Sequence, residues 1–334
     1  MRAMTTLLAI VLLTGSTAEA AAPGYHLLRT VPISGDGGGD YVTVDSAARR
    51  VYVSHATEVV VLDADSYEVT GRITDLKGVH GIAVAPDLGR GFISNGQGNN
   101  VTIFELKTLK TVGTVATGRN PDAILFDAVT QRVFAFNGRS NSVTVIEAKD
   151  GSVAGTIELG GKPEFAVADG TGSVFVNLED KNMVVKIDAR GLKVRERWPV
   201  APGEGPGSMA MDTKHRRLFI GCANKLLVVF NADTGKVVDK QPIGDRVDAS
   251  AFDPATGLVF CSNGDGTVTV IHQDGPDKYS VAETVKTPVG SKTMGLDPKT
   301  HQLFIPTAKF KPVTGNARRR VVEPGTFAVL VYGP

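Results

Sequence analysis

A repeat of 40 to 44 residues runs through the chain and constrains its fold more than any other feature. In most copies an Asp in a turn is followed seven positions later by an aromatic residue that opens a short apolar run. Seven aromatic residues mark the copies: Tyr52, Phe92, Phe134, Phe175, Phe219, Phe260 and Phe304. Seven copies of this period are typical of the four-stranded blades of a β-propeller.

Each copy has the pattern of four short strands. In the third copy we expect strands at 122–126, 132–136, 143–147 and 152–157, with a turn at Lys149-Asp150-Gly151 before the last of them. Apolar and polar residues alternate along the third strand, as in a half-buried strand, and no helix-length segment intervenes. The 38 glycines and 17 prolines agree with many tight turns. A helical solenoid is therefore excluded, and the chain is predicted to be all-β.

The two ends of the chain predict how the ring closes. The last copy supplies only three strands, near 293–296, 303–306 and 327–331, while the N-terminal segment 27–33 resembles fourth-strand segments such as 110–115. Pairing between the two ends would hide the last open sheet edge. We therefore predict one seven-bladed β-propeller domain of four-stranded antiparallel blades, within residues 21–334, whose N-terminal strand completes the C-terminal blade.

The first 20 residues have the pattern of a secretory signal peptide. Arg2 precedes an apolar run at 7–13, and Ala18-Glu19-Ala20 forms a small-x-small cleavage site. The apolar run is much shorter than the roughly 20 residues that cross a bilayer. No later segment has the length of a membrane span, and no cysteine follows the cleavage site to carry a lipid. We expect cleavage after Ala20 and a periplasmic or secreted protein.

Charge and cysteine content narrow the function classes. Lys and Arg total 36 against 35 Asp and Glu, a formal net charge of +1, which disfavours a dedicated nucleic-acid-binding protein. Cys222 and Cys261 stand at unequal offsets in successive repeats, which disfavours a disulfide but leaves pairing open. Sequence motifs for redox, zinc, serine-hydrolase and nucleotide chemistry are missing. We predict no cofactor and leave a divalent metal open.

The repeat carries a family resemblance. Tyr52-Val53-Ser54-His55, Phe92-Ile93-Ser94-Asn95 and Phe260-Cys261-Ser262-Asn263 resemble variants of the YVTN β-propeller repeat, as does the flanking Asn120-Pro121-Asp122. The resemblance covers about residues 25–334 and is closest to exported YncE-like seven-bladed proteins. It implies the propeller fold and, as in other propellers, a binding face over the mouth of the central channel. It implies little about function, because members of the family have different roles.

Strand direction predicts which residues gather at that face. Because strands alternate in direction, the ends of the second strands and the starts of the first strands meet at one face of the ring. The candidate ligand-binding residues there are His55, His80, Asp122, Glu164, Glu179, Asp180, Asp248 and Asp265. Histidines and carboxylates around one opening can bind a metal or act as acid and base. The metal candidates among them are His55, His80, Glu164 and Asp248.

Ordinary structural roles compete with this interpretation. Asn95, Asn137 and Asn263 each precede a glycine, so turn formation explains them. His55 occupies the same position as these asparagines, and His80 is aligned with Pro or Gly of other copies, so neither histidine is part of the repeat. Asp122 and Asp248 can instead accept bonds from backbone amides, and Glu164, which follows Pro163, can cap a blade junction. The Glu179-Asp180 pair can be a solvated loop tip. The seven aromatic residues are expected to pack between blades.

One link departs from the repeat. The link between the second and third strands of the last copy runs from about 308 to 325 and contains five basic residues: Lys309, Lys311, Arg318, Arg319 and Arg320. A long basic loop on the binding face can dock an acidic protein or an anionic ligand, or it can be a solvated insertion.

The favoured function is a non-enzymatic, exported binding or scaffold propeller, expected to be a monomer. Its partner is an unidentified exported protein or a small ligand at the channel-mouth face. The alternative is a metal-dependent hydrolase resembling propeller lactonases in architecture, with its site at the same face. A third interpretation is an accessory to an exported oxidoreductase, in which any cofactor belongs to the partner because this chain has no attachment motif for one.

Overall fold

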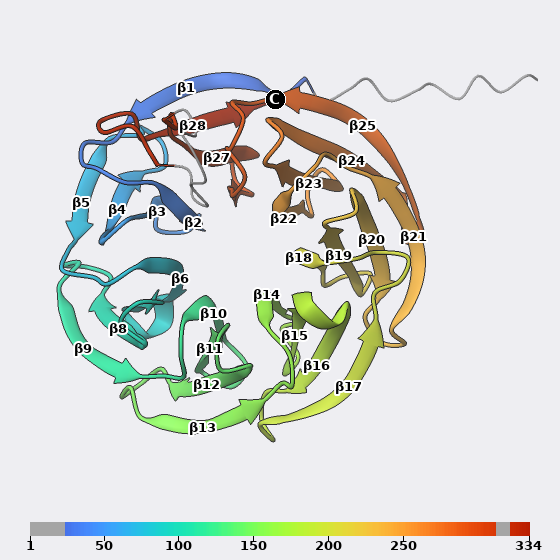
Figure 1. Ribbon diagram of the computed structural model, residues 1–334, viewed down its shortest axis with the longest axis horizontal. Helices are drawn as coiled ribbons and strands as arrows, with labels where there is room; N and C mark the ends of the chain where they lie inside the picture. The colour runs from blue at the N-terminus through green and yellow to red at the C-terminus, as the bar shows by residue number, and fades with distance from the viewer. Residues whose placement is uncertain (1–23, 312–320) are drawn as a thin grey trace, which may run out of the picture.

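The chain folds into a ring of seven four-stranded antiparallel sheets around a central channel (Figure 1). The computed structural model describes residues 24–311 and 321–334. Each sheet is one blade, and the hydrogen-bonded order of its strands follows their order in the sequence, except in the last blade. The predicted seven-bladed β-propeller is therefore confirmed. The predicted signal peptide, 1–20, lies outside the described residues.

In each blade the first strand given below is the innermost, beside the channel, and the fourth is the outermost. Blade 1 contains β2 (Gly39–Asp45), β3 (Arg50–His55), β4 (Glu58–Asp63) and β5 (Val69–Ile73). Blade 2 contains β6 (Val79–Ala85), β7 (Arg90–Asn95), β8 (Asn100–Glu105) and β9 (Thr111–Ala116). Blade 3 contains β10 (Pro121–Asp127), β11 (Arg132–Asn137), β12 (Ser142–Glu147) and β13 (Val153–Glu158). Blade 4 contains β14 (Pro163–Ala168), β15 (Ser173–Leu178), β16 (Met183–Asp188) and β17 (Lys193–Pro199).

The remaining blades follow the same plan. Blade 5 contains β18 (Pro206–Asp212), β19 (Arg217–Cys222), β20 (Leu226–Asn231) and β21 (Lys236–Pro242). Blade 6 contains β22 (Val247–Asp253), β23 (Leu258–Asn263), β24 (Thr267–Gly275) and β25 (Lys278–Lys286). Blade 7 contains β26 (Gly295–Asp297), β27 (Gln302–Thr307), β28 (Ala328–Gly333) and β1 (His26–Pro32).

Blade 7 joins the two ends of the chain. β1 pairs antiparallel with β28, from His26 opposite Gly333 to Pro32 opposite Ala328, and is the outermost strand of this blade. This is the pairing that the last, three-stranded copy of the repeat led us to expect. It leaves no free strand edge between the N-terminal and C-terminal parts of the ring.

Helix is almost absent from the described residues. Two 3-10 turns occur there, η1 (Pro86–Leu88) and η2 (Glu179–Lys181). Within the described ranges no helix has both the length and the apolar character that a bilayer span requires. Cys222 and Cys261 are buried free thiols, and burial raises the pKa of each to about 12.

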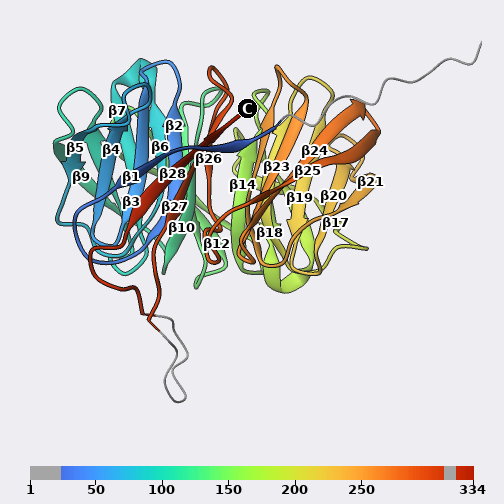
Figure 2. The ribbon, with the colours of Figure 1, turned by 90° about the horizontal axis from the view of Figure 1, so that it is seen from above.

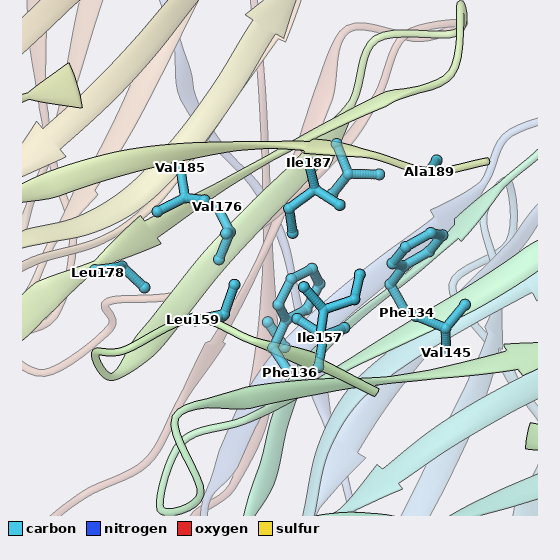
Figure 3. Packing of buried hydrophobic residues seen from close by; sticks show 13 residues of the cluster. Phe134, Phe136, Val145, Ile157, Leu159, Val176, Leu178, Val185, Ile187 and Ala189 are labelled. Atoms are coloured by element: carbon cyan, nitrogen blue, oxygen red, sulfur yellow. The ribbon is translucent and has the colours of Figure 1, made fainter. Parts of the chain in front are cut away.

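The seven repeated aromatic residues pack between neighbouring blades, as predicted. All seven are fully buried, and each belongs to a cluster that includes apolar residues of the following blade. Figure 3 shows one cluster, in which Phe134 and Phe136 of blade 3 pack against Val176 and Ile187 of blade 4. Burying an aromatic side chain contributes about 1.5–3 kcal/mol. The repeat therefore encodes the contacts that hold one blade to the next.

The turn between the first and second strands of most blades is held by a buried Asp. These side chains, here called the turn carboxylates, are Asp45, Asp127, Asp169, Asp212, Asp253 and Asp297. Each accepts at least one backbone N–H from its own turn, such as Ala48 N–H on Asp45 Oδ1 at 2.9 Å. Some also accept a side chain of a neighbouring blade, as Asp297 does from Arg49 at 2.7 Å. They fix the face of the ring opposite the channel mouth.

Candidate functional site

The structure aligns one residue per blade around the channel mouth. Each lies near the start of the innermost strand, five positions before the turn carboxylate of its blade or, in blade 2, before Ala85, which takes the place of that carboxylate. We call this set the mouth ring: Asp40, His80, Asp122, Glu164, Gly207, Asp248 and Lys292. The alignment of His80 with Pro or Gly, made from the sequence, was wrong, because His80 shares its position with these mainly acidic residues. Unlike the turn carboxylates, the mouth ring varies in residue type from blade to blade.

A β-bulge sets the direction of these side chains. In six blades the pairing between the first and second strands shifts at the mouth ring, for example between Gly39 and Val42 around Asp40. An extra residue in one strand turns the local backbone and re-aims a side chain. The same irregularity in these six blades therefore directs the mouth-ring side chains to one place rather than into the blade cores.

The mouth ring surrounds a small polar pocket of about 150 Å³. Its lining residues are Asp40, Tyr41, Asp122, Glu164, Gly207, Asp248 and Lys292. Tyr41 of blade 1 stacks on Phe165 of blade 4, with ring centroids 5.7 Å apart, so an aromatic pair spans the channel beside the charged groups. The pocket is large enough to hold several water molecules.

His80 connects the carboxylates of blades 1 and 3. Its Nδ1 lies 2.6 Å from Asp40 Oδ2 and 3.5 Å from Asp122 Oδ1. Burial opposes the charged imidazolium, but the hydrogen bond to Asp40 and the nearby carboxylate charges outweigh it and raise the pKa of His80. One ligand atom from each of Asp40, His80 and Asp122 lies within 4.8 Å of the other two, a spacing that can hold a metal ion.

Asp122 has a strongly raised pKa. Burial is the largest influence, and together with the charges of Asp40 and Glu164 it outweighs the attraction of His80 and raises the pKa of Asp122 to about 7. A carboxyl group with this pKa exchanges its proton near neutral pH. Such groups occur most often where a ligand or a reaction needs them.

Two lysines neutralise the other side of the ring. Lys162 Nζ lies 2.8 Å from Glu164 and 2.5 Å from Glu179, and Lys292 Nζ lies 2.7 Å from Asp248. Burial raises the pKa values of Glu164 and Asp248 even with these cations beside them. These carboxylates therefore sit where ionisation is costly, and the two ammonium groups limit that cost.

The structure does not bring His55 to this pocket. Its ring is buried in blade 1, stacked face to face on Phe327 at 4.4 Å, and its Nδ1 lies 3.2 Å from Glu58. The four predicted metal candidates therefore do not form one cluster. The group with metal-binding spacing instead combines His80 with Asp40 and Asp122. His55 failed as a candidate because strand direction identifies the face but not the side chain's orientation.

The other predicted rim residues lie in loops outside the pocket lining. Glu179 contacts Lys162, and Asp180 accepts the backbone N–H of Lys162 at 2.7 Å. Asp265 accepts the backbone N–H of Asp245 at 2.7 Å and so joins two loops. The asparagines are structural, but turn formation does not explain them: they are buried at the ends of β7, β11 and β23, without a positive φ, and their side-chain amides donate to a threonine of their own blade.

Sequence reasoning missed four contributors to the site: Asp40, Tyr41, Lys162 and Lys292. For Asp40 and Lys292 a signal existed, because both stand five positions before a turn carboxylate, as Asp122 and Asp248 do. Asp40 follows a run of three glycines that has the pattern of a loop, and Lys292 precedes the short β26. No repeat signal marks Tyr41, whose partner Phe165 lies 124 positions away in the chain.

The predicted basic loop is described only at its base. Lys309 and Lys311 lie beside an isolated bridge between Phe310 and Val322, at the base of the link between β27 and β28. Figure 2 shows the base of this link projecting from one face of the ring. The backbone N–H of Lys311 donates to the carbonyl of Val321 at 2.8 Å. Arg318, Arg319 and Arg320 lie outside the described residues.

A larger hollow does not compete with the mouth pocket as a chemical site. A cavity of about 520 Å³ lies between blades 1 and 2, lined by threonine and aliphatic side chains with Arg72, Asp75 and Lys110. The shifted carboxyl groups of Asp122, Glu164 and Asp248 all line the mouth pocket instead. The mouth pocket is therefore the candidate site of this ring.

Comparison with known proteins identifies a family and a fold. Residues 46–241 match the family of a domain of unknown function, DUF5074. No curated protein matches the chain. A chain of a solved structure titled "Crystal Structure of Mitotic Checkpoint Complex" is similar with a TM-score of 0.75 and 15% identity, over 90% of this chain and 95% of that one. A chain titled "Structure of U3-55K" has a TM-score of 0.75 and 11% identity, over 93% and 99%. At these identities the likeness concerns the fold alone.

Proposed function

The chain belongs to the DUF5074 family, whose description assigns no activity, and on that premise we propose that it is a non-enzymatic binding propeller. Its mouth pocket binds a small ligand or a small group of a partner protein. The propeller fold suits a binding or scaffold role, because seven blades supply one rigid rim to which each contributes a side chain.

One observation carries this proposal: the mouth ring gathers ionisable groups that the blades do not need for their construction. Four carboxylates and an ammonium group of the ring line one pocket of about 150 Å³, and the imidazole of His80 lies against two of these carboxylates. Gly207 occupies the same position in blade 5, so a blade forms without a polar side chain there. Buried charge is costly, and polar groups that packing does not require are candidates for binding.

The sequence also supports proposals about where the protein is located and about its relation to a more specific protein family. We propose that residues 1–20 are a signal peptide cleaved after Ala20, that the mature protein is periplasmic or secreted, and that it is related to the YncE-like proteins of the YVTN repeat family. The small-x-small site at Ala18-Glu19-Ala20 supports the first point, and the repeated Phe92-Ile93-Ser94-Asn95 type of motif supports the last. N-terminal sequencing of the mature protein tests the cleavage; an intact Met1 in the exported fraction contradicts it.

A thermal-shift screen tests the binding function. The protein is screened at pH 8 against a library of small cations, anions and neutral metabolites, beside the double variant Asp122→Asn, Glu164→Gln. We expect at least one compound to raise Tm in the wild type and not in the double variant, because a ligand that binds only the folded state stabilises it. Asp245→Asn, an exposed carboxylate outside the pocket, is the matched control. A library in which no compound distinguishes the ring variant from the control contradicts the function.

A second candidate, a metal-dependent hydrolase, is favoured by the spacing of Asp40, His80 and Asp122. A divalent cation held by these groups would activate water for attack on an ester or lactone. Elemental analysis of protein prepared without chelator tests it, with His80→Ala as the variant. One equivalent of metal that His80→Ala loses, together with lactone hydrolysis, supports this candidate; metal-free wild type without hydrolysis rejects it.

The basic loop is the proposed contact for a partner protein. Lys309 and Lys311 are exposed at its base, and its remaining basic residues are Arg318, Arg319 and Arg320. Positive charge at the rim would attract an acidic surface and raise the rate of association. Partner capture that survives Arg318→Ser, Arg319→Ser, Arg320→Ser contradicts this role.

A further inference from the structure

The charges of the mouth ring do not balance, and the imbalance is local. Three of its four carboxylates have a cation of their own in the ion pairs described above. Asp122 is the fourth: its nearest cation is His80, 3.5 Å away and hydrogen-bonded to Asp40 instead. Glu179 also shares Lys162, but its side chain is 42% exposed at the rim, where water screens its charge.

The Asp122 carboxylate has no hydrogen-bond donor among the described residues. Its backbone carbonyl accepts a bond from Ser94, but within the described chain no hydrogen bond reaches its side chain, which is only 19% exposed. A carboxylate at this depth normally accepts at least one hydrogen bond, whereas Asp122 has only the ion pair with His80 at 3.5 Å. Asp122 also lines the pocket. The acceptor that the protein leaves open therefore faces the space in which a ligand would lie.

Size and wall chemistry limit what can fill that space. A volume of about 150 Å³ suits a small ligand or one group of a larger molecule, because pockets that enclose drug-sized ligands measure about 300–1,000 Å³. Tyr41, backed by Phe165, makes part of the wall aromatic, and aromatic faces attract organic cations. A divalent metal needs several carboxylates free of other cations, whereas three here are engaged by His80, Lys162 and Lys292.

We propose that the mouth pocket recognises a primary ammonium group on a short alkyl chain, with Asp122 as its counter-ion. This inference rests on the proposed binding function and names its ligand class. One positive charge matches the one carboxylate without a cation, and the three N–H donors of an ammonium match the acceptors of neighbouring mouth-ring carboxylates. The group belongs either to a free amine or to a lysine side chain of a partner.

Calorimetry with simple probes tests the ligand class. Butylammonium chloride is titrated into the full-length protein at pH 8, with 1-butanol and butyrate as neutral and anionic probes of the same size. We expect one site with a Kd of about 1 mM or lower for butylammonium and none for the other two. Asp122→Asn should weaken binding at least about tenfold, and Asp245→Asn should leave it unchanged. Melting curves verify that each variant is folded, and Asp122→Ser replaces the amide if it is not.

The outcomes distinguish a failure of the ammonium assignment from a failure of the proposed binding function. Nα-acetyl-lysine amide that binds more tightly than butylammonium identifies a partner's lysine as the source, and weaker binding identifies a free amine. Butylammonium that binds no better than 1-butanol, or equally well to Asp122→Asn, overturns the ammonium assignment. If Zn²⁺ or Ca²⁺ alone then binds in a His80-dependent manner, the pocket remains a binding site and only its ligand class is wrong. If no probe and no compound of the library binds at the ring, both proposals fail.

Discussion

Aspartate side chains lie at both ends of the innermost strands, but their pKa values are lowered at one end and raised at the other. At one end, burial tends to raise the pKa of Asp169, Asp212 and Asp297, but hydrogen bonds from turn amides, side chains and neighbouring blades outweigh it and lower all three. At the other end, burial raises the pKa of Asp122 to about 7 because no hydrogen bond compensates it. The carboxylates that build the fold accept hydrogen bonds from it, whereas the side chain of Asp122, one of four carboxylates that line the pocket, accepts none from the described residues.

The largest expected effect comes from removing a satisfied carboxylate. Asp297 is fully buried and accepts bonds from Ser46, Arg49 and Thr300. Asp297→Ala leaves Arg49 without its buried partner at the contact between blades 7 and 1, so we expect the free energy of unfolding to fall by about 3 kcal/mol. Denaturant unfolding at pH 7 measures it. A loss below about 1 kcal/mol would mean that this carboxylate is not structural.

The lowered pKa of Asp297 adds a pH signature. Its carboxylate stabilises the fold above the unfolded pKa of 3.8, and this contribution is lost as pH falls through the lower folded pKa. Wild type should therefore lose stability on acidification below about pH 4. Asp297→Ala should lose less over the same range. Equal losses would contradict the assignment.

A mouth-ring carboxylate should give the opposite sign. Because the pKa of Asp122 is about 7 in the folded chain and 3.8 in the unfolded chain, the folded protein binds this proton more tightly, and stability falls as pH rises from about 4 to 7. Asp122→Asn removes the charge, so we expect it to raise the free energy of unfolding at pH 8 by about 2 kcal/mol. The gain should disappear at pH 5, where Asp122 is protonated in the folded chain. The groups facing it, His80, Asp40, Glu164 and Lys162, are unchanged in this comparison.

The smallest effect tests whether the pocket wall matters to the fold. The Tyr41 hydroxyl makes one long hydrogen bond, 3.4 Å from the carbonyl of Glu164. Tyr41→Phe keeps the stack on Phe165, so we expect the free energy of unfolding to change by about 0.5 kcal/mol or less. Thermal unfolding of both proteins measures the difference. A change above about 1.5 kcal/mol would show that the hydroxyl holds blades 1 and 4 together.

The same contrast explains what the sequence can predict. Phe134 and Asp127 recur because every blade needs an interblade contact and a closed turn, so the fold could be read from their spacing. The mouth ring varies by residue type. Its spacing of five positions before the turn is visible in the sequence, but the bulge that directs its side chains is not. His55 and His80 lie near the same face, yet local pairing buries His55 against Phe327 and places His80 against Asp40 of the mouth ring.

The most direct test of the contrast is the titration of Asp122 itself. In protein labelled with ¹³C at the aspartate carboxyl carbons, the signal absent from Asp122→Asn is followed from pH 3 to pH 9. We predict a midpoint near 7, as its raised pKa implies, and a shift of that midpoint to lower pH when butylammonium is added, because a bound cation favours the charged form. A midpoint near 4 that butylammonium does not move would show that Asp122 is an ordinary solvated carboxylate. This result would contradict the interpretation of the mouth ring as a binding site.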